Sequence, residues 1–169
     1  MNKLRLIKSL ESNNFSRETI EAFKKVKREN FISESLCDRA YDDTALPLEN
    51  GATISQPYTI AFMLNLLELK QKQKILEIGS GCGYVLALIA EITQGEIYGV
   101  EILPELAKKS RANLKNYKNV KINNKNGFEG LKEKSPFDRI LVSAAASEIP
   151  KHLFKQLKQN GILVIPINN

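Results

Sequence analysis

Two hydrophobic patterns divide this chain of 169 residues. Up to residue 73, apolar positions recur at the spacing of helices. Ser16 is a candidate N-cap for one of these helices, and Pro57 stands at the favoured first position of another. The apolar face expected after Ser16 is made by Ile20, Phe23 and Val26. Residues 36–56 keep neither a helical nor a strand period. We therefore expect residues 1–73 to form an N-terminal extension of helices and loop.

From residue 74 onward, short apolar runs alternate with helical segments. The predicted strands are 75–78, 96–100, 120–123, 139–143 and 162–166, and the predicted helices are 84–93, 104–116 and 150–157. Such alternation is typical of parallel strands joined by right-handed crossovers. The pattern predicts an α/β fold, a doubly wound Rossmann-like sheet over residues 74–169. With the extension it makes one domain, which suits the length of the protein.

The first predicted strand leads into three glycines at alternate positions, Gly79, Gly81 and Gly83. Glycine lacks a Cβ, so this turn can be tight and a ligand can lie against its backbone. Glu101 ends the second apolar run, about 20 residues further on, where a Rossmann-like sheet places the carboxylate that binds ribose hydroxyls. The glycine spacing is not that of dinucleotide sites, which favours a nucleoside without a pyrophosphate, above all S-adenosylmethionine. The alternative is a tight turn that binds nothing.

Composition narrows the class of protein. The sequence is 43% hydrophobic and 26% charged, as in ordinary globular domains. No apolar run approaches the length of a membrane span, and the N-terminus lacks the core of a signal peptide, so we expect a cytoplasmic protein without membrane contact. The two cysteines lack metal-type spacing, which predicts neither a metal site nor a disulfide. Cys82 is interpreted as a small residue in the turn, because His152, the only histidine, is far away.

A net charge of +6 permits nucleic-acid binding, but the lysines are scattered rather than grouped.

Four segments carry more specific information: residues 40–47, 52–58, 76–84, and 137–166, where 144–150 reads Ala-Ala-Ala-Ser-Glu-Ile-Pro. Together they resemble the protein-L-isoaspartate O-methyltransferase family, from about residue 20 to the end of the sequence. Many methyltransferases share the glycine loop, whereas the Thr53-Ile54-Ser55 segment and residues 144–150 are more specific to this family.

The resemblance implies methyl transfer from S-adenosylmethionine to the free carboxylate of isoaspartyl residues in damaged proteins, which are then the partners. A carboxylate is already ionised at neutral pH, so it needs no general base. The site has only to hold the reacting atoms in line. Ser55 is the implied contact to the substrate carboxylate. The implied cofactor-binding residues are Ala52, Thr53, Ile54, Glu77, Gly79, Ser80, Gly81, Gly83, Glu101, Ile102, Asn126 and Gly127. Asp138, Tyr41 and Asp43 are expected to support the sheet and the loop over the site.

Several alternatives stay open at this point. Ser55 is also placed to cap the helix that begins at Pro57. The family usually has Asp-Gly where this protein has Asn126-Gly127, which predicts weaker donor binding. The family continues past the last predicted strand, 162–166, which would otherwise be an unpaired edge. We therefore weigh a fragment, self-association through that edge, and an impaired nucleoside-binding remnant. A methyltransferase acting on another substrate such as RNA is the remaining alternative, although residues 143–146 lack the signature of amino-directed enzymes.

Overall fold

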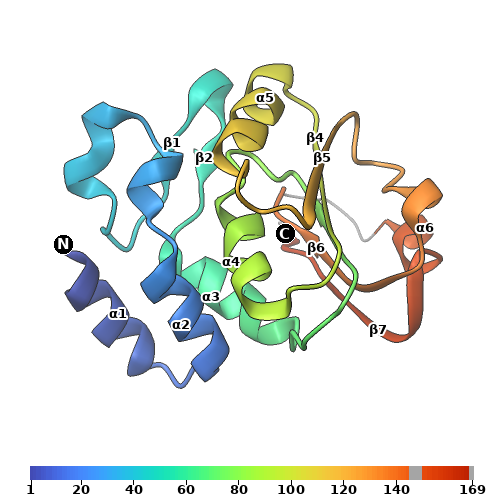
Figure 1. Ribbon diagram of the computed structural model, residues 1–169, viewed down its shortest axis with the longest axis horizontal. Helices are drawn as coiled ribbons and strands as arrows, with labels where there is room; N and C mark the ends of the chain where they lie inside the picture. The colour runs from blue at the N-terminus through green and yellow to red at the C-terminus, as the bar shows by residue number, and fades with distance from the viewer. Residues whose placement is uncertain (145–149, 168–169) are drawn as a thin grey trace.

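The computed structural model describes residues 1–144 and 150–167 of the protein (Figure 1). Its centre is a parallel sheet of five strands in the order β5-β4-β3-β6-β7. The strands are β3 (Ile75–Ile78), β4 (Ile97–Glu101), β5 (Val120–Asn124), β6 (Phe137–Val142) and β7 (Leu157–Val164). The order reverses direction beside β3, so the switch point of the sheet lies between β3 and β6. This confirms the predicted Rossmann-like fold.

Helices α4 (Tyr84–Thr93), α5 (Pro104–Asn113) and α6 (Lys151–Phe154) follow β3, β4 and β6 in sequence. All four residues of β3 and nearly all of α4 are buried, which explains why their sequences are mostly apolar rather than alternating, with Glu77 as the exception within β3. Tyr84, at the start of α4, contacts the rings of Phe23 and Phe31 in edge-on geometry. The N-terminal extension therefore packs directly on the helix that follows the glycine loop.

The extension contains α1 (Lys3–Glu11), α2 (Arg17–Lys25) and α3 (Pro57–Leu66), with short 3₁₀ turns at Arg28–Phe31 and Glu34–Arg39. The Ser16 side chain accepts a hydrogen bond from the Thr19 amide, which confirms the predicted cap of α2. Residues 36–56 are mostly irregular, as expected, but they include a small hairpin of β1 (Leu46–Pro47) and β2 (Thr53–Ile54). No helix among the described residues combines the length and apolar character needed to cross a bilayer.

The predicted boundaries near the C-terminal end were wrong. The last strand was expected at 162–166 and the helix before it at 150–157, but α6 ends at Phe154 and β7 already begins at Leu157. Polar residues 158–160 are exposed and lie in an irregularity of the pairing with β6, between Leu157 and Ile162, where Asn160 adopts a left-handed φ of 61°. The strand β7 lies at one edge of the sheet. Self-association through this edge stays a prediction.

Candidate functional site

The glycine loop joins β3 to α4, and its backbone explains the three glycines. Gly79, Gly81 and Gly83 all have left-handed φ values, of 77°, 52° and 87°. A Cβ at Gly83 would lie 2.5 Å from the Ser110 hydroxyl oxygen, too close for any side chain. The turn therefore needs glycine whether or not a ligand binds. The glycines alone therefore do not indicate a ligand, whereas a pocket beside the loop does.

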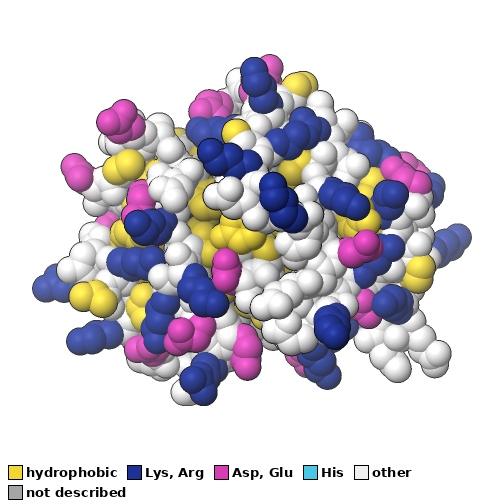
Figure 2. All heavy atoms as spheres, in the orientation of Figure 1, with side chains coloured by type: hydrophobic (Ala, Val, Ile, Leu, Met, Phe, Trp, Pro, Cys, Tyr) yellow, Lys and Arg dark blue, Asp and Glu magenta, His cyan; other side chains and the backbone are white. Residues whose placement is uncertain are grey.

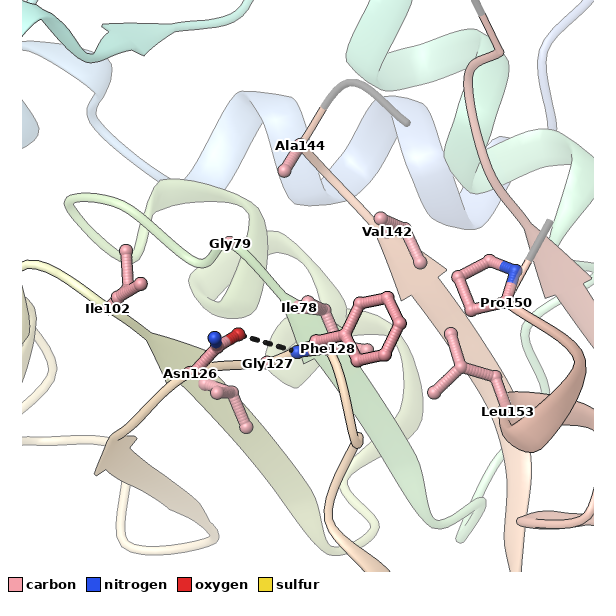
Figure 3. Close-up of a pocket in the computed structure, with 11 residues that line it drawn as sticks. Ile78, Gly79, Ile102, Asn126, Gly127, Phe128, Val142, Ala144, Pro150 and Leu153 are labelled. Atoms are coloured by element: carbon pink, nitrogen blue, oxygen red, sulfur yellow. Dashed lines mark hydrogen bonds between the residues drawn. The ribbon is translucent and has the colours of Figure 1, made fainter. Parts of the chain in front are cut away.

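An apolar pocket of about 270 Å³ opens beside the loop, at the carboxyl ends of the strands (Figure 3). One side of it is formed by Ile78 and Val142, the last residues of β3 and β6, and by Val100, the last but one of β4. Doubly wound sheets bind their ligands at this place. Four predicted site residues line the pocket: Gly79, Ile102, Asn126 and Gly127.

Asn126 is the polar side chain among these four. Its Oδ1 accepts a hydrogen bond of 2.9 Å from the amide of Phe128, the dashed line in Figure 3. This contact fixes the amide group at the mouth of the apolar pocket. Phe128 is 63% exposed and packs against His152 with the ring centroids 5.0 Å apart and the planes tilted by 49°, and the His152 ring also contacts the Phe128 carbonyl oxygen. His152 thus has a structural contact at the rim of the pocket.

A second, smaller and more polar pocket adjoins the first. It is lined by the predicted Thr53, Ile54, Ser55, Glu77, Gly79, Ser80 and Gly81, together with Cys82 and Ser143. Gly79 lines both pockets, so they meet at the glycine loop. One wall comes from the sheet and the other from the β1–β2 hairpin. Three predicted site residues, Ala52, Gly83 and Glu101, line neither pocket.

Glu77 is the unusual group in the polar pocket. Its side chain is 1% exposed, and its Oε1 accepts a hydrogen bond of 2.6 Å from the Ser143 hydroxyl. Its other oxygen has no hydrogen-bond partner among the described residues. Burial raises the pKa of Glu77 to about 8, and the nearby Glu101 adds to the shift. The group is therefore mostly uncharged at neutral pH.

Glu101 holds the glycine loop in place. Its carboxylate is 5% exposed and accepts hydrogen bonds from the amide of Gly81, at 2.7 Å, and from the amide of Leu103, at 2.9 Å. It thereby ties the loop to the end of β4. Each carboxylate oxygen can accept a second hydrogen bond, so a ribose contact at Glu101 stays a prediction.

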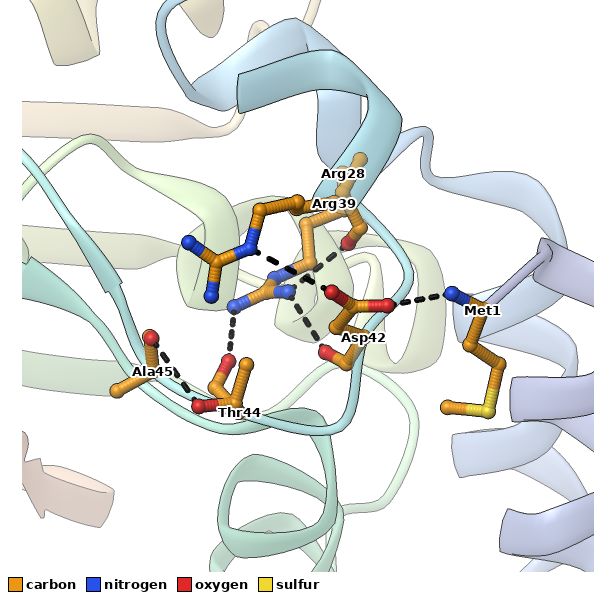
Figure 4. A network of polar contacts seen from close by, with 7 residues as sticks. Met1, Arg28, Arg39, Asp42, Thr44 and Ala45 are labelled. Atoms are coloured by element: carbon orange, nitrogen blue, oxygen red, sulfur yellow. Dashed lines mark hydrogen bonds and ion pairs between the residues drawn. The ribbon is translucent and has the colours of Figure 1, made fainter.

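The structure adds Arg28, which the sequence analysis did not identify. Arg28 is completely buried, and its guanidinium donates hydrogen bonds to the carbonyl oxygens of Ala40, Asp42, Thr44 and Ser55 at 2.9–3.3 Å. Figure 4 shows most of this network. Arg28 therefore gathers the irregular backbone of residues 40–44 and fixes the backbone of Ser55 itself. In the sequence it is one of several basic residues between positions 24 and 28, and nothing distinguishes it from its exposed neighbours.

Asp43 performs the capping that Ser55 was considered for. Its carboxylate accepts hydrogen bonds from the Tyr58 amide, at 2.8 Å, and from the Gln56 side chain, at 3.2 Å. The N-cap position of α3 belongs to Gln56, and Ser55 lies outside it. The capping interpretation of Ser55 is therefore wrong, and its hydroxyl remains available to the polar pocket. Asp43 does order the loop, as expected.

The remaining candidates have structural surroundings. Burial raises the pKa of the Cys82 thiol to about 11, which keeps it protonated and unreactive at neutral pH. The Asp138 carboxylate accepts hydrogen bonds from the amide of Lys74, at 2.7 Å, and from the ammonium of Lys158, at 2.9 Å, so it supports the sheet as expected. Within the segment 144–150, residues 145–149 lie outside the described residues.

Comparisons with known proteins agree with this geometry. A family model described as protein-L-isoaspartate(D-aspartate) O-methyltransferase matches residues 1–169. A protein-L-isoaspartate O-methyltransferase 2 from Archaeoglobus fulgidus is 45% identical over 160 residues, which are 92% of this chain and 73% of the relative. A protein-L-isoaspartate O-methyltransferase from Methanothrix thermoacetophila is 43% identical and covers 100% of this chain and 82% of its own length.

Two solved structures of proteins with the same family name also match this chain. A protein-L-isoaspartate O-methyltransferase matches with a TM-score of 0.91 at 29% identity, over 99% of this chain and 56% of that one. A putative protein-L-isoaspartate O-methyltransferase from Plasmodium falciparum, in complex with S-adenosyl-L-homocysteine, matches with a TM-score of 0.84 at 31% identity. This match covers 100% of this chain and 85% of that one. Both superpose the N-terminal extension as well as the sheet.

Proposed function

Because the chain belongs to the protein-L-isoaspartate O-methyltransferase family, we propose that it transfers a methyl group from S-adenosylmethionine to the free carboxylate of isoaspartyl residues. The observation that carries the proposal is the meeting of two pockets at Gly79. One is apolar and suits a nucleoside, and the other is polar and contains Ser55. Methyl transfer needs this juxtaposition of a donor and an acceptor.

The apolar pocket fits the adenosine part of the donor. Ile78, Val100 and Val142 offer apolar surface to a base, and the Asn126 amide can bond to its polar edge. Ala52 and Gly83 line neither pocket, and a contact of either with the donor stays a prediction. Glu101 is assigned to the ribose hydroxyls, because its carboxylate sits at the end of β4 beside Gly81.

The buried, unpartnered oxygen of Glu77 is the observation that fits the methionine end of the donor. A polar atom in this position normally has a partner, so a ligand group that can donate a hydrogen bond would satisfy it. The ammonium group of S-adenosylmethionine is such a donor. When bound, the cofactor supplies an electrophilic methyl group on a positively charged sulfur.

The acceptor side of the cleft only has to bind the substrate carboxylate and orient it. The Ser55 hydroxyl donates a hydrogen bond to the substrate carboxylate, and Arg28 holds the Ser55 backbone through its carbonyl oxygen at 3.1 Å. Glu77 shares this pocket, and a donor ammonium group bound to it would compensate its charge, so that it would not repel the anionic substrate. Closing the cleft on the acceptor would exclude water from the sulfonium.

Isoaspartyl proteins are the proposed partners. Figure 2 shows Lys and Arg side chains spread over the whole visible face and interspersed with acidic ones, rather than gathered along one groove. Nucleic-acid binders concentrate their basic residues. This distribution favours a protein substrate over RNA.

The test is methyl transfer from labelled S-adenosylmethionine to an isoaspartyl peptide, with the matching aspartyl peptide as control. Ser55→Ala should lower the transfer rate roughly 10–100-fold, the value of one hydrogen bond to a charged group, and leave donor affinity within about twofold. Ser33→Ala, at an exposed serine outside both pockets, is the matched variant and should change neither. Equal labelling of both peptides, or labelling of RNA alone, would refute the proposal. An unimpaired Ser55→Ala enzyme would remove Ser55 from it.

A further inference from the structure

Three Asn-Gly pairs occur in the described part of the protein, and the structure separates them sharply. They are Asn50-Gly51, Asn126-Gly127 and Asn160-Gly161. An asparagine followed by glycine is prone to deamidation, because no side chain shields the glycine nitrogen from the asparagine carbonyl carbon. The reaction requires local freedom of the backbone, so the surroundings decide which pair reacts.

Asn50-Gly51 is the open pair. It forms the tip of the β1–β2 hairpin, where both residues are exposed and have left-handed φ values, of 56° and 75°. A Cβ placed on Gly51 would meet no atom within 4 Å. The Asn50 side chain makes no hydrogen bond to any described residue. One backbone hydrogen bond spans the pair, from the Ala52 amide to the Glu49 carbonyl oxygen at 3.2 Å, and it lies at the exposed tip, where local opening costs least.

The other two pairs are restrained. Asn126 is fixed by the hydrogen bond from the Phe128 amide, and a Cβ on Gly127 would lie 2.5 Å from a methyl carbon of Ile78. Asn160-Gly161 lies in the irregular part of β7 between Leu157 and Ile162, which both pair with β6, and a Cβ on Gly161 would lie 2.9 Å from the Lys158 carbonyl oxygen. The Asn160 side chain is exposed, so close packing at the glycine is what restrains this pair, as it restrains Asn126-Gly127.

We propose that Asn50-Gly51 is a modification site, at which deamidation impairs the enzyme and creates an isoaspartyl substrate for a second copy of this protein. The last part rests on the function proposed above. The Gly51 nitrogen forms a bond to Asn50 Cγ and gives up its proton, while the bond between Cγ and Nδ2 of Asn50 breaks and ammonia leaves. Water then opens the ring at the backbone carbonyl carbon of residue 50. The product is an isoaspartyl linkage with a free carboxylate.

The place of this lesion explains its effect. The same hairpin continues through Thr53 and Ile54 to Ser55, with Thr53 paired to Pro47 and Ile54 to Leu46. An isoaspartyl linkage lengthens the backbone by one methylene and adds a negative charge. The charge appears next to Glu49, whose carboxylate pairs with the Lys109 ammonium of α5 at 2.7 Å. Both changes disturb the wall of the polar pocket.

Repair requires a second copy because the backbone holds the hairpin tip away from Ser55 of the same molecule. Between the tip and Ser55 the backbone is extended, and four residues of strand span roughly 13 Å. The modified tip cannot fold back to its own Ser55 without opening the hairpin. It is nevertheless exposed, so the cleft of another molecule can receive it.

Ageing of the purified protein at mildly alkaline pH, followed by peptide mapping in heavy-oxygen water, tests the modification itself. We expect isoaspartate at position 50 several-fold above positions 126 and 160. Asn50→Gly keeps a residue that tolerates positive φ and removes the amide, and Asn160→Gly is the matched control at the other pair with positive φ. If isoaspartate at position 50 were absent, or no more abundant than at positions 126 and 160, the proposal would be overturned. This readout does not depend on any methyl transfer.

The effect on the enzyme is measured on the same samples. Aged wild type and aged Asn160→Gly should lose activity in parallel, whereas aged Asn50→Gly should retain it. Fresh Asn50→Gly enzyme with labelled donor should then label the position-50 peptide of aged wild type. Equal loss in aged Asn50→Gly would overturn the link to activity. If fresh enzyme labels a synthetic isoaspartyl peptide but not the aged protein, repair by a second copy is refuted. If it labels neither, the proposed function has failed.

Discussion

The two sides of the cleft are built in different ways. The donor side consists of the ends of β3, β4 and β6 and the glycine loop, so its position follows from strand pairing and a buried apolar sheet. The acceptor side consists of a two-residue strand, a turn and an irregular segment. That irregular segment is held by side chains, above all those of Arg28 and Asp43. A regular scaffold thus positions the cofactor pocket, whereas a few buried polar contacts position the substrate pocket.

This difference predicts that the acceptor side can fail while the donor side still binds. The carbonyl oxygens of residues 40, 42, 44 and 55 depend on one guanidinium. Strand ends have no comparable single support, because each is held on both sides by a ladder of hydrogen bonds. Replacing Arg28 is therefore the clearest test of whether the two sides are supported independently.

Arg28→Met should have the largest effect. It deprives one buried and three partly buried carbonyl oxygens of their partner. At about 1–3 kcal/mol for each group left without a partner, we expect a loss of more than about 3 kcal/mol in the free energy of unfolding. Urea denaturation measures this loss. Arg39→Met is the matched control, because Arg39 is exposed and pairs only with Asp42 at 3.6 Å; it should cost less than about 1 kcal/mol.

Arg28→Lys keeps a buried positive charge but cannot reach as many carbonyl oxygens. If this variant folds, its transfer rate should fall while its affinity for S-adenosylmethionine, measured by titration calorimetry, stays near that of the wild type. Equal losses of donor affinity and transfer would show that the two sides of the cleft are not independently supported.

The next test acts on the donor side. Gly83→Ala forces an unfavourable φ of 87° and a contact of 2.5 Å with the Ser110 oxygen, whereas Gly51→Ala at a φ of 75° meets open space. The left-handed conformation alone costs roughly 1–2 kcal/mol. We expect about that loss for Gly51→Ala and roughly 1–3 kcal/mol more for Gly83→Ala, from overpacking. Unfolding free energies that are equal within error would mean that Ser110 and Leu114 move aside at little cost.

The same contrast explains what the sequence could predict. The range of α4 was predicted to the residue and that of β3 likewise, because mostly apolar runs next to the glycine loop leave few alternatives. The pockets at the ends of the strands follow from that topology. Ser55, Thr53 and Ile54 were identified only through a family resemblance, since their local pattern is neither helix nor strand.

Arg28 and the start of β7 could not be predicted for one shared physical reason. Their structure depends on partners far along the sequence: Arg28 bonds to residues 12 to 27 positions away, and Leu157 pairs with Phe137. A local pattern contains no trace of such contacts. The exposed polar residues at the start of β7 resemble a loop for the same reason.

Glu77 lies where the two sides meet, and its ionisation should appear in the pH dependence of stability. Burial raises its pKa from 4.5 to about 8, so between those values the folded state keeps a proton that the unfolded state has lost. Stability should therefore fall as the pH rises through this window, by up to about 1.4 kcal/mol per pH unit. Glu77→Gln, which mimics the uncharged form, should lack this fall in urea denaturation at several pH values. Glu34→Gln, at an exposed acid, should retain the wild-type slope. A wild-type slope in Glu77→Gln would mean that other groups cause it.

The smallest expected effect concerns how tightly the donor side binds. Asn126 offers one acceptor oxygen, which already accepts from the Phe128 amide at 2.9 Å, so an adenine amino group can reach only its second, uncharged lone pair. The other polar atom of this side chain is a donor. Asn126→Asp keeps an oxygen for Phe128 and adds a second, charged one. The gain from a charge-assisted bond is about 1 kcal/mol, so titration calorimetry should show roughly fivefold tighter binding of S-adenosylmethionine. Asn160→Asp supplies the same charge away from the cleft and should leave the affinity unchanged. An affinity that Asn126→Asp does not alter would place the adenine edge elsewhere, and it would leave the apolar strand ends as the main support of the donor.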